Sequence, residues 1–193
     1  MPDHRTPLHS ICVYCGSRNG ADPAFRAAAA DLGALIAERN WRLVYGAGDV
    51  GLMGEVARAA QTAGAETFGV IPTHLLAREK GKRDLTRMIV TENMHERKKV
   101  MFMNSDAIVV LPGGAGTLDE FFEVLTWRQI GLHEKPIFLL NTNGYWTPLA
   151  ALIDHVIAGG FAEPDLRGLV GLVPDVAALD MALQVALAAR TPA

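Results

Sequence analysis

The stretch AIVVLPGGAGT, residues 107–117, decides the fold of this chain. Its first five residues are all apolar, and three of them are β-branched. Such a run predicts a strand that is buried on both faces of a sheet. The three glycines that follow predict a tight turn, and the pattern over residues 115–131 predicts a helix. A strand, a glycine turn and a helix in this order are typical of a parallel sheet that binds ligands at its strand ends.

The same alternation of short β-rich runs and helical patterns extends along the chain. Strands are predicted at residues 9–15, 42–45, 67–71, 88–91, 107–111, 136–140 and 169–173. Helices are predicted at residues 23–39, 51–63, 93–104, 115–131, 145–158 and 176–189. Strands that alternate with helices predict an α/β fold, doubly wound, with a mostly parallel sheet and helices on both faces. With 193 residues, the chain is expected to form one domain that spans residues 1–193.

Composition excludes several classes of protein. Half of the residues are hydrophobic and the formal net charge is −3, a balance that can build a core and argues against disorder. No apolar run approaches the roughly 18 residues of a membrane span, and residues 1–7 lack the layout of a signal peptide. We therefore expect a cytoplasmic protein without membrane contact. The chain is also not basic enough for a protein that binds nucleic-acid polymers.

The charges are distributed unevenly along the chain. Residues 78–99 contain eight Lys or Arg and four acidic residues, so this stretch is +4 while the remainder of the chain is −7. A solvated charged loop is one interpretation of such a stretch. A local anion site is the other.

Neither the cysteines nor the histidines predict a metal or redox site. Cys12 and Cys15 lie three residues apart on a predicted strand, so their side chains should point to opposite faces of the sheet. No second cysteine pair completes a zinc site, and the six histidines have no metal-ligand spacing. We therefore expect structural thiols, no metal and no cofactor.

The segment Gly46-x-Gly48-x-x-Gly51 matches the dinucleotide fingerprint, follows a predicted strand and opens a predicted helix. That motif also needs an acidic residue near the end of the next strand, where it binds the ribose. The next strand ends at Pro72, and its Glu66 lies at the opposite end. The pattern therefore disfavours NAD and an oxidoreductase. Contact with another phosphate or nucleotide, or a turn where helix and strand pack closely, remain as interpretations.

The glycine turn at residues 113–117 carries more information. Successive N–H groups at the start of a helix form a binding site for anions, and the Thr117 hydroxyl can add a donor. No lysine follows the last glycine, so the segment is not a Walker A loop. A nucleoside monophosphate is therefore favoured over a triphosphate with Mg²⁺, and a tight turn without ligand is the alternative.

Glu120 follows this turn by one helical turn. It lies four residues after Gly116, about 6 Å along the same helix face. This rise is roughly the span from the 5′-phosphate of a nucleotide to its anomeric carbon, so the carboxylate could polarise a water there. The helix period places Phe122 and Leu125 towards the core and Glu123 on the face of Glu120. A solvated acidic residue is the alternative for either glutamate.

A second helix places cations on an apolar stripe. Met94, Arg97, Lys98 and Met101 share one face at i, i+3, i+4 and i+7. A cation on a partly buried stripe needs an anionic partner, and a phosphate or a carboxylate such as Glu120 would serve. Arg97 can reach both with its forked donors, whereas Lys98 acts as a point charge. Side chains that snorkel at the edge of a core are the alternative.

The chain resembles the Lonely Guy family in two linked motifs: Met94-x-x-Arg97-Lys98-x-x-Met101 and Pro112-Gly113-Gly114-x-Gly116-Thr117-x-x-Glu120. Further matches that extend the likeness over most of residues 9–160 are Cys15-Gly16-Ser17, Gly51-Leu52-Met53-Gly54, Leu125-Thr126-Trp127, Lys135-Pro136 and Asn143-Gly144-Tyr145. The chain departs from the family at Ala47, where a third glycine is usual. We expect little consequence, because alanine tolerates turn positions that do not need a positive φ.

Members of this family are cytokinin riboside 5′-monophosphate phosphoribohydrolases, often mislabelled lysine decarboxylases. The resemblance implies a Rossmann-like fold, a homodimer, and hydrolysis of N6-modified adenosine 5′-monophosphate (AMP) to free base and ribose 5-phosphate. It implies Arg97 and Glu120 as the catalytic pair. The expected substrate-binding residues are the following: Gly16, Ser17, Gly46, Gly48, Glu79, Lys98, Gly113, Gly114, Ala115, Gly116, Thr117, Leu118, Asp119 and Thr126.

Two rival functions are a non-catalytic carrier and a dinucleotide-dependent oxidoreductase, and the missing ribose acid already disfavours the second; the lysine decarboxylase label fails on chemistry. A nucleotide- or cofactor-binding carrier of the same fold would bind without turnover, but a carrier has no need for both Arg97 and Glu120. A lysine decarboxylase would need a Schiff-base lysine and a site for pyridoxal phosphate, and no lysine stands in a recognisable site of that kind. The sequence therefore favours an N-glycosidase that acts on a purine nucleoside monophosphate.

Overall fold

The computed structural model describes residues 7–76 and 84–189. Its strands are β1 (Ser10–Tyr14), β2 (Arg42–Tyr45), β3 (Glu66–Pro72), β4 (Arg87–Thr91), β5 (Ala107–Val110), β6 (Ile137–Leu140) and β7 (Gly171–Val173). Its α-helices are α1 (Pro23–Glu38), α2 (Gly51–Thr62), α3 (Met94–Met103), α4 (Ala115–Gln129), α5 (Thr147–Ala158) and α6 (Val176–Ala188). Short 3₁₀ turns are η1 (Thr73–Leu75), η2 (Thr142–Gly144) and η3 (Pro164–Leu169).

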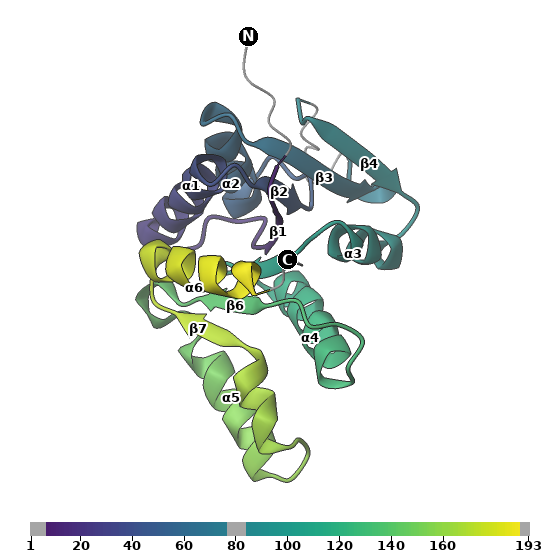
Figure 1. The fold of residues 1–193 in the computed structure, drawn as a ribbon. Helices are drawn as coiled ribbons and strands as arrows, with labels where there is room; N and C mark the ends of the chain where they lie inside the picture. Colours follow the sequence, from purple (N-terminus) through teal and green to yellow (C-terminus); the bar gives the residue numbers. More distant parts are fainter. Residues whose placement is uncertain (1–6, 77–83, 190–193) are drawn as a thin grey trace.

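The seven strands form one sheet in the order β4-β3-β2-β1-β5-β6-β7, and every described pair is parallel. The predicted α/β class and parallel sheet are therefore confirmed, with the predicted bounds within two residues of those observed. Helices cover both faces of the sheet (Figure 1). Helices α1, α2 and α6 pack on one face and α3, α4 and α5 on the other, because their apolar residues belong to two separate cores.

Strands β1 and β5 lie at the centre of the sheet and contribute side chains to both hydrophobic cores. Along β1, Ile11 and Val13 enter one core while Cys12 and Tyr14 enter the other, as the two-residue period of a strand requires. The predicted placement of the cysteines on opposite faces is confirmed, because Cys15 belongs to the core opposite to that of Cys12. Both thiols are buried and neither forms a disulfide, and burial raises the pKa of Cys12.

The strand order reverses between β1 and β5. From β1 the chain proceeds through β2 and β3 towards one edge, whereas β5 begins the path to the other edge. The segment after β1 leads to α1 on one face, and the segment after β5 leads to α4 on the other. In open parallel sheets a crevice forms at such a point, beyond the carboxyl ends of the two strands.

Ala47 corrects one expectation. Its φ is +58°, in the left-handed region, so this position does require the conformation that glycine adopts at no cost. The side chain is fully buried, and its Cβ lies 2.7 Å from where a Cβ at Gly69 would stand. The strain at Ala47 therefore comes with a methyl group that packs over a glycine of β3.

The orientation of α4 corrects another. Phe121 is fully buried in the core, whereas Phe122 is 38% exposed, so the core-facing aromatic residue is Phe121. Leu125 does face the core, as predicted. A helix turns by about 100° per residue, so a one-residue error in the face exchanges a buried and an exposed side chain.

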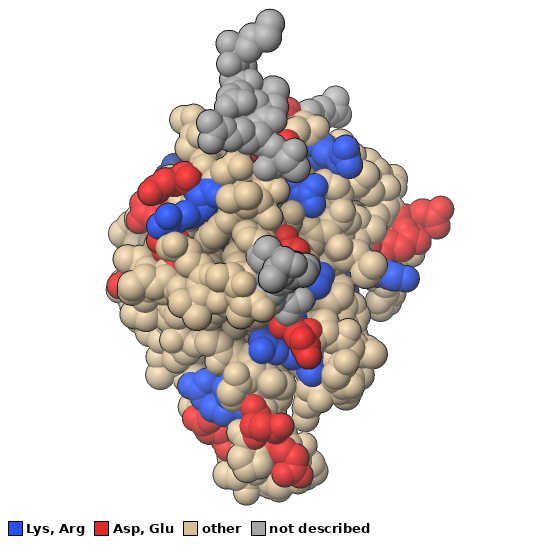
Figure 2. All heavy atoms as spheres, viewed as in Figure 1, with Lys and Arg blue, Asp and Glu red and all other residues tan. Residues whose placement is uncertain are grey.

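Charged side chains of both signs are interspersed on the face seen in Figure 2. Two cations of the basic stretch, Arg97 and Lys98, are buried rather than solvated, which supports a special local role over a simple charged loop.

Among the described residues, no helix is both long and apolar enough to cross a bilayer.

Gly33 provides a test of the packing between α1 and α2. A Cβ at this position would overlap the carbonyl oxygen of Val56 and lie 2.8 Å from the Cβ of Ala59. We expect Gly33→Ala to cost about 1–3 kcal/mol through overpacking, which lowers Tm by about 3–10 °C for a chain of this length. Gly168→Ala, where a Cβ meets no atom within 4 Å, is the matched control for thermal melts. Equal Tm values for the two variants would contradict the proposed tight helix contact.

Candidate functional site

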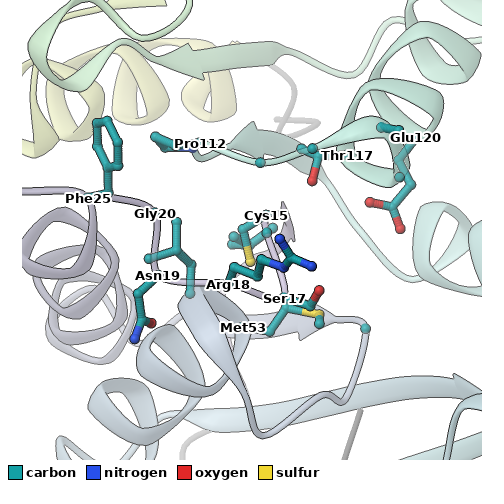
Figure 3. Close-up of a pocket in the computed structure, with 18 of the residues that line it drawn as sticks. Cys15, Ser17, Arg18, Asn19, Gly20, Phe25, Met53, Pro112, Thr117 and Glu120 are labelled. Carbon is teal, nitrogen blue, oxygen red and sulfur yellow. The ribbon is translucent and has the colours of Figure 1, made fainter. Parts of the chain in front are cut away.

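A cavity of about 470 Å³ lies beyond the carboxyl ends of β1 and β5, in the range of sites for small molecules. Its walls include the segment after β1, the start of α2 and the segment that leads into α4 (Figure 3). The end of β2 and helix α3 also contribute to the lining. The lining includes these sequence-predicted residues: Gly16, Ser17, Gly46, Arg97, Gly113, Gly114, Ala115, Gly116, Thr117 and Glu120. The structure therefore brings the two linked family motifs, on α3 and at the start of α4, together with the Cys15-Gly16-Ser17 segment around one cavity.

The segment before α4 approaches the segment after β1 very closely. The N–H of Gly16 donates to the carbonyl of Pro112 at 3.0 Å. A Cβ at Gly113 would collide with the Thr117 side chain and lie 2.9 Å from the Gly16 nitrogen, so only glycine fits there. At Gly114 and Gly116, in contrast, a Cβ would meet no atom within 4 Å. These two glycines therefore border open space.

The start of α4 has no side chain that caps it. Gly114 occupies the N-cap position, so no cap side chain accepts from the N–H groups of the first turn. Such N–H groups have no acceptor within the helix, and the helix dipole adds partial positive charge at this end. The first turn of α4 therefore offers donors to an anion in the cavity.

The Arg97 side chain is anchored to the sheet by hydrogen bonds. Its side chain is buried, with the residue 4% exposed. Its Nε donates to the carbonyl of Val70 at 3.1 Å and its Nη2 to the carbonyl of Gly46 at 2.7 Å. Its Nη1 lies 3.8 Å from the sulfur of Met94. The end of β2 and the end of β3 thus fix the guanidinium at the cavity wall.

Gly46 explains part of the glycine fingerprint. A Cβ at this position would collide with Nη2 of Arg97, so the glycine makes room for the arginine. Gly51, with φ +60°, lies against the backbone of Ser17 and Arg18. Gly48 is buried and does not belong to the cavity lining. Close packing, one of the two interpretations left open by the sequence, therefore accounts for two of these glycines.

Glu120 lies one turn inside α4, and the residue is only 9% exposed. Figure 3 shows its carboxylate and the Thr117 hydroxyl on one side of the space that Ser17 and Arg18 border from the other. A solvated carboxylate would be far more exposed, so the alternative interpretation of Glu120 does not hold. Glu120 and Arg97 line the same cavity, although they come from different helices.

Lys98 turns away from the cavity and pairs with α4. Its Nζ lies 2.9 Å from a carboxylate oxygen of Asp119 and 3.1 Å from one of Glu123. Burial lowers the pKa of Lys98, but the two carboxylates outweigh it and hold the pKa above its ordinary value. Arg97 and Lys98 are thus neighbours in sequence with different partners.

Several predicted residues do not belong to the described cavity lining. Lys98 and Asp119 are joined in the ion pair, Leu118 packs at the edge of a core, and Thr126 is exposed on α4. Glu79 lies outside the described residues. Glu123 does not share the cavity with Glu120, because it contacts Lys98.

Other lining residues were not predicted as ligand contacts. Arg18 directly follows Cys15-Gly16-Ser17 after β1, Phe25 lies in the first turn of α1, and Tyr145 comes from the turn before α5. The only sequence signal for Arg18 was its position next to Ser17. Phe25 and Tyr145 are 120 residues apart, and their rings meet edge to face at 5.2 Å between centroids. No local pattern could have paired them.

The described residues contain no group of three or more His, Cys, Asp or Glu that could hold a metal ion. None of the described lining residues is a lysine. The cations on the described part of the wall are Arg18 and Arg97.

Known proteins similar to this chain fall into two groups. The family model described as "Possible lysine decarboxylase" matches residues 53–183. A probable cytokinin riboside 5′-monophosphate phosphoribohydrolase of Oryza sativa subsp. japonica is 44% identical over 91% of this chain and 78% of its own length. A cytokinin riboside 5′-monophosphate phosphoribohydrolase of Arabidopsis thaliana is 41% identical over 88% of this chain and 79% of its own.

The second group consists of solved structures. The molybdenum cofactor (Moco) carrier protein of Chlamydomonas reinhardtii superposes with a TM-score of 0.73, at 26% identity, over 96% of this chain and 99% of that one. The fold is therefore shared by phosphoribohydrolase relatives and by carrier structures, and the side chains of the cavity must decide between them.

The open glycines provide a test of the anion site. Gly116→Ala should fold normally, because the new Cβ meets no atom and alanine suits a helix. The same methyl group should obstruct AMP, the ligand predicted from the sequence. We expect the Kd of AMP, measured by calorimetry in a Glu120→Gln background in which AMP is not consumed, to rise about 5- to 150-fold, since overpacking costs about 1–3 kcal/mol. Gly113→Ala should instead lower Tm, through its collision with Thr117. An unchanged Kd in Gly116→Ala would argue against an anion at the start of α4.

Proposed function

Since this chain belongs to the Lonely Guy family, whose model carries the older lysine decarboxylase description, we propose that it hydrolyses the N-glycosidic bond of AMP or of N6-modified AMP. The products would be the free base and ribose 5-phosphate. The observation that carries the proposal is the convergence of the buried Arg97, the buried Glu120 and the uncapped start of α4 on one cavity.

The 5′-phosphate is placed at the start of α4. Backbone N–H groups of residues 113–117 and the Thr117 hydroxyl supply donors there. Arg18 supplies a positive charge from the opposite wall, since it lines the same cavity. Binding energy from the phosphate, which is remote from the reacting bond, then holds the sugar near Glu120.

Glu120 is assigned to the water and to the sugar. When the C1′–N bond breaks, its electron pair leaves with the base and positive charge develops on the ribose. A buried carboxylate stabilises that charge and can accept a proton from the attacking water. The water oxygen bonds to C1′ and keeps one proton as the new hydroxyl, and the other proton passes through Glu120 to the base nitrogen.

Arg97 is assigned to orientation. Two of its donors are held by the carbonyls of Val70 and Gly46, so the guanidinium has a fixed position. A guanidinium has five N–H donors in a planar fork, and those that remain can orient the ligand and Glu120. A lysine could not form the same pair of backbone bonds and present further donors in one plane.

Non-catalytic carriage of a nucleotide-like cofactor is the alternative, because carrier structures share the fold. The pair Arg97 and Glu120 favours turnover. Incubation with AMP and with isopentenyl-AMP, followed by an assay for ribose 5-phosphate, separates the two functions. Binding without release of ribose 5-phosphate would support the carrier.

Glu120→Gln keeps the size of the side chain and removes its charge. We expect kcat to fall about 10²- to 10⁴-fold, the range for a general base, with a smaller change in KM because the charge acts in the transition state. Arg97→Lys should impair both parameters, since an ammonium cannot replace the fork.

The matched control is Glu123→Gln, which makes the same chemical change one turn further along α4, where the carboxylate faces Lys98. Steady-state kinetics on variants checked by thermal melts decide the assignment. Activity of Glu120→Gln within about threefold of wild type, far short of the loss typical of a general base, would move the role elsewhere.

The proposal includes a homodimer through α3 and α4. The two helices are in contact through Phe102 and Trp127, whose rings lie 5.1 Å apart. The exposed apolar side chains of α3, α4 and the segment after α4 are Met103, Phe122, Ile130 and Leu132. Thr126 is also exposed on α4, so a substrate contact by this residue would have to arise at the dimer interface.

Ile130→Glu tests the interface. Ile130 is 63% exposed, so the substitution is compatible with the folded chain. Burial of an unpaired carboxylate costs several kcal/mol, enough to raise the dimer Kd about 10³-fold. We expect a monomer in analytical ultracentrifugation. Val185→Glu on α6, where the valine is 74% exposed, is the control that should remain dimeric. Identical masses for the two variants would exclude this face.

A further inference from the structure

Tyr145 connects the turn before α5 to the segment that leads into α4. Its hydroxyl donates to the carbonyl of Gly113 at 2.7 Å. Tyr145 and Gly113 both line the cavity, and they are separated by 32 residues in sequence. The contact therefore acts on the backbone of the anion site from outside the segment itself.

The carbonyl groups of Pro112, Gly113 and Gly114 each accept a hydrogen bond. The Pro112 carbonyl accepts from the N–H of Gly16 at 3.0 Å, and the Gly114 carbonyl accepts from the N–H of Leu118 at 3.0 Å. The Gly113 carbonyl between them accepts from Tyr145. In a trans peptide the C=O and the following N–H point in opposite directions. The N–H groups of Gly113 and Gly114 are therefore turned away from Gly16 and from Tyr145.

Glycine makes this arrangement possible and also easy to lose. Gly113 and Gly114 have no Cβ that restricts φ and ψ, so each peptide plane can rotate into other allowed conformations. A hydrogen bond to the Gly113 carbonyl fixes the plane whose other end is the N–H of Gly114. The Tyr145 hydroxyl thus selects one orientation of that donor.

The Tyr145 ring is itself held by its neighbours. It meets Phe25 edge to face, and it meets Trp146 at 4.7 Å with an interplanar angle of 83°. The indole Nε1 of Trp146 donates to the carbonyl of Val110 at 3.2 Å, at the end of β5. Asn143, in the same turn, donates to the Asp22 carboxylate at the start of α1, at 2.8 Å. The turn is therefore anchored to β5 and to α1.

We propose that Tyr145 is a positioning residue for the phosphate: its hydroxyl orients the Gly113–Gly114 peptide so that the Gly114 N–H donates to the 5′-phosphate of the substrate. This inference rests on the proposed function for the identity of the ligand. It adds a residue that acts on the anion through the backbone.

Tyr145→Phe removes the hydroxyl and keeps the ring between Phe25 and Trp146. We expect the Kd of AMP, measured by calorimetry with every variant in the Glu120→Gln background so that AMP is not consumed, to rise about fivefold, the change that corresponds to one neutral hydrogen bond of ~1 kcal/mol. The Kd of inorganic phosphate should rise by a similar factor. The Kd of adenosine, which has no phosphate, should stay within about twofold. In kinetics with AMP, KM should rise while kcat at saturation is retained.

The matched control is Tyr45→Phe. The Tyr45 hydroxyl is buried and has no hydrogen-bond partner among the described residues, and Tyr45 does not line the cavity. Its removal should leave the Kd of AMP unchanged. Thermal melts on both variants establish that each is folded.

Three outcomes would overturn the positioning role. In the first, the Kd of AMP in Tyr145→Phe equals that of wild type. In the second, the Kd of adenosine rises as much as that of AMP, which would place the hydroxyl near the nucleoside instead. In the third, wild-type protein binds neither AMP nor inorganic phosphate. Wild-type protein that binds AMP without releasing ribose 5-phosphate would refute hydrolysis alone, and the comparison of Kd values would still decide the role of Tyr145.

Discussion

The hydrogen bond from the N–H of Gly16 to the carbonyl of Pro112 joins the two segments between which the cavity lies. β1 and β5 are neighbours in the sheet, but the chain leaves them towards opposite faces. The crevice therefore opens directly beyond this bond. A Cβ at Gly113 would lie 2.9 Å from the Gly16 nitrogen, so the approach requires glycine at residue 113, and a Cβ at Gly16 would lie 3.3 Å from the Cα of Gly113, which leaves little room at residue 16. The position of α4, and with it of Glu120, follows from this contact.

Burial of two adjacent cations on α3 imposes a second constraint. A buried charge is tolerated only when polar groups surround it, and Arg97 and Lys98 meet this requirement in different ways. The guanidinium donates to carbonyls at the ends of β2 and β3, whereas the ammonium lies between two carboxylates of α4. Helix α3 is thereby tied to the sheet on one side and to α4 on the other. Arg97 and Glu120 consequently face one cavity in a defined arrangement.

The glycine fingerprint has a different physical basis from the one its spacing first indicates. In a dinucleotide site the glycines let the backbone approach a pyrophosphate. Here Gly46 leaves room for the Arg97 side chain, and Gly51 leaves room for the backbone after β1. Gly46 lines the cavity beside Arg97, whereas Gly51 packs outside the described lining. A motif of this kind therefore indicates close approach of chain segments, and the approaching group has to be found from the structure.

Local patterns in the sequence determined the order of the elements, the α/β class, the central strand β5 and the glycine turn that opens α4. They also singled out Arg97 and Glu120 as candidates, and both line the cavity, because a charge at an apolar helix position and a carboxylate one turn after a glycine turn are local features. The partner of Lys98, the exposure of Phe122 and the positive φ of Ala47 were decided by tertiary structure. So was the meeting of Arg18, Phe25 and Tyr145 around the cavity. The physical reason is that these properties depend on contacts between segments far apart in sequence, whereas periodicity and turn chemistry report only on neighbours along the chain.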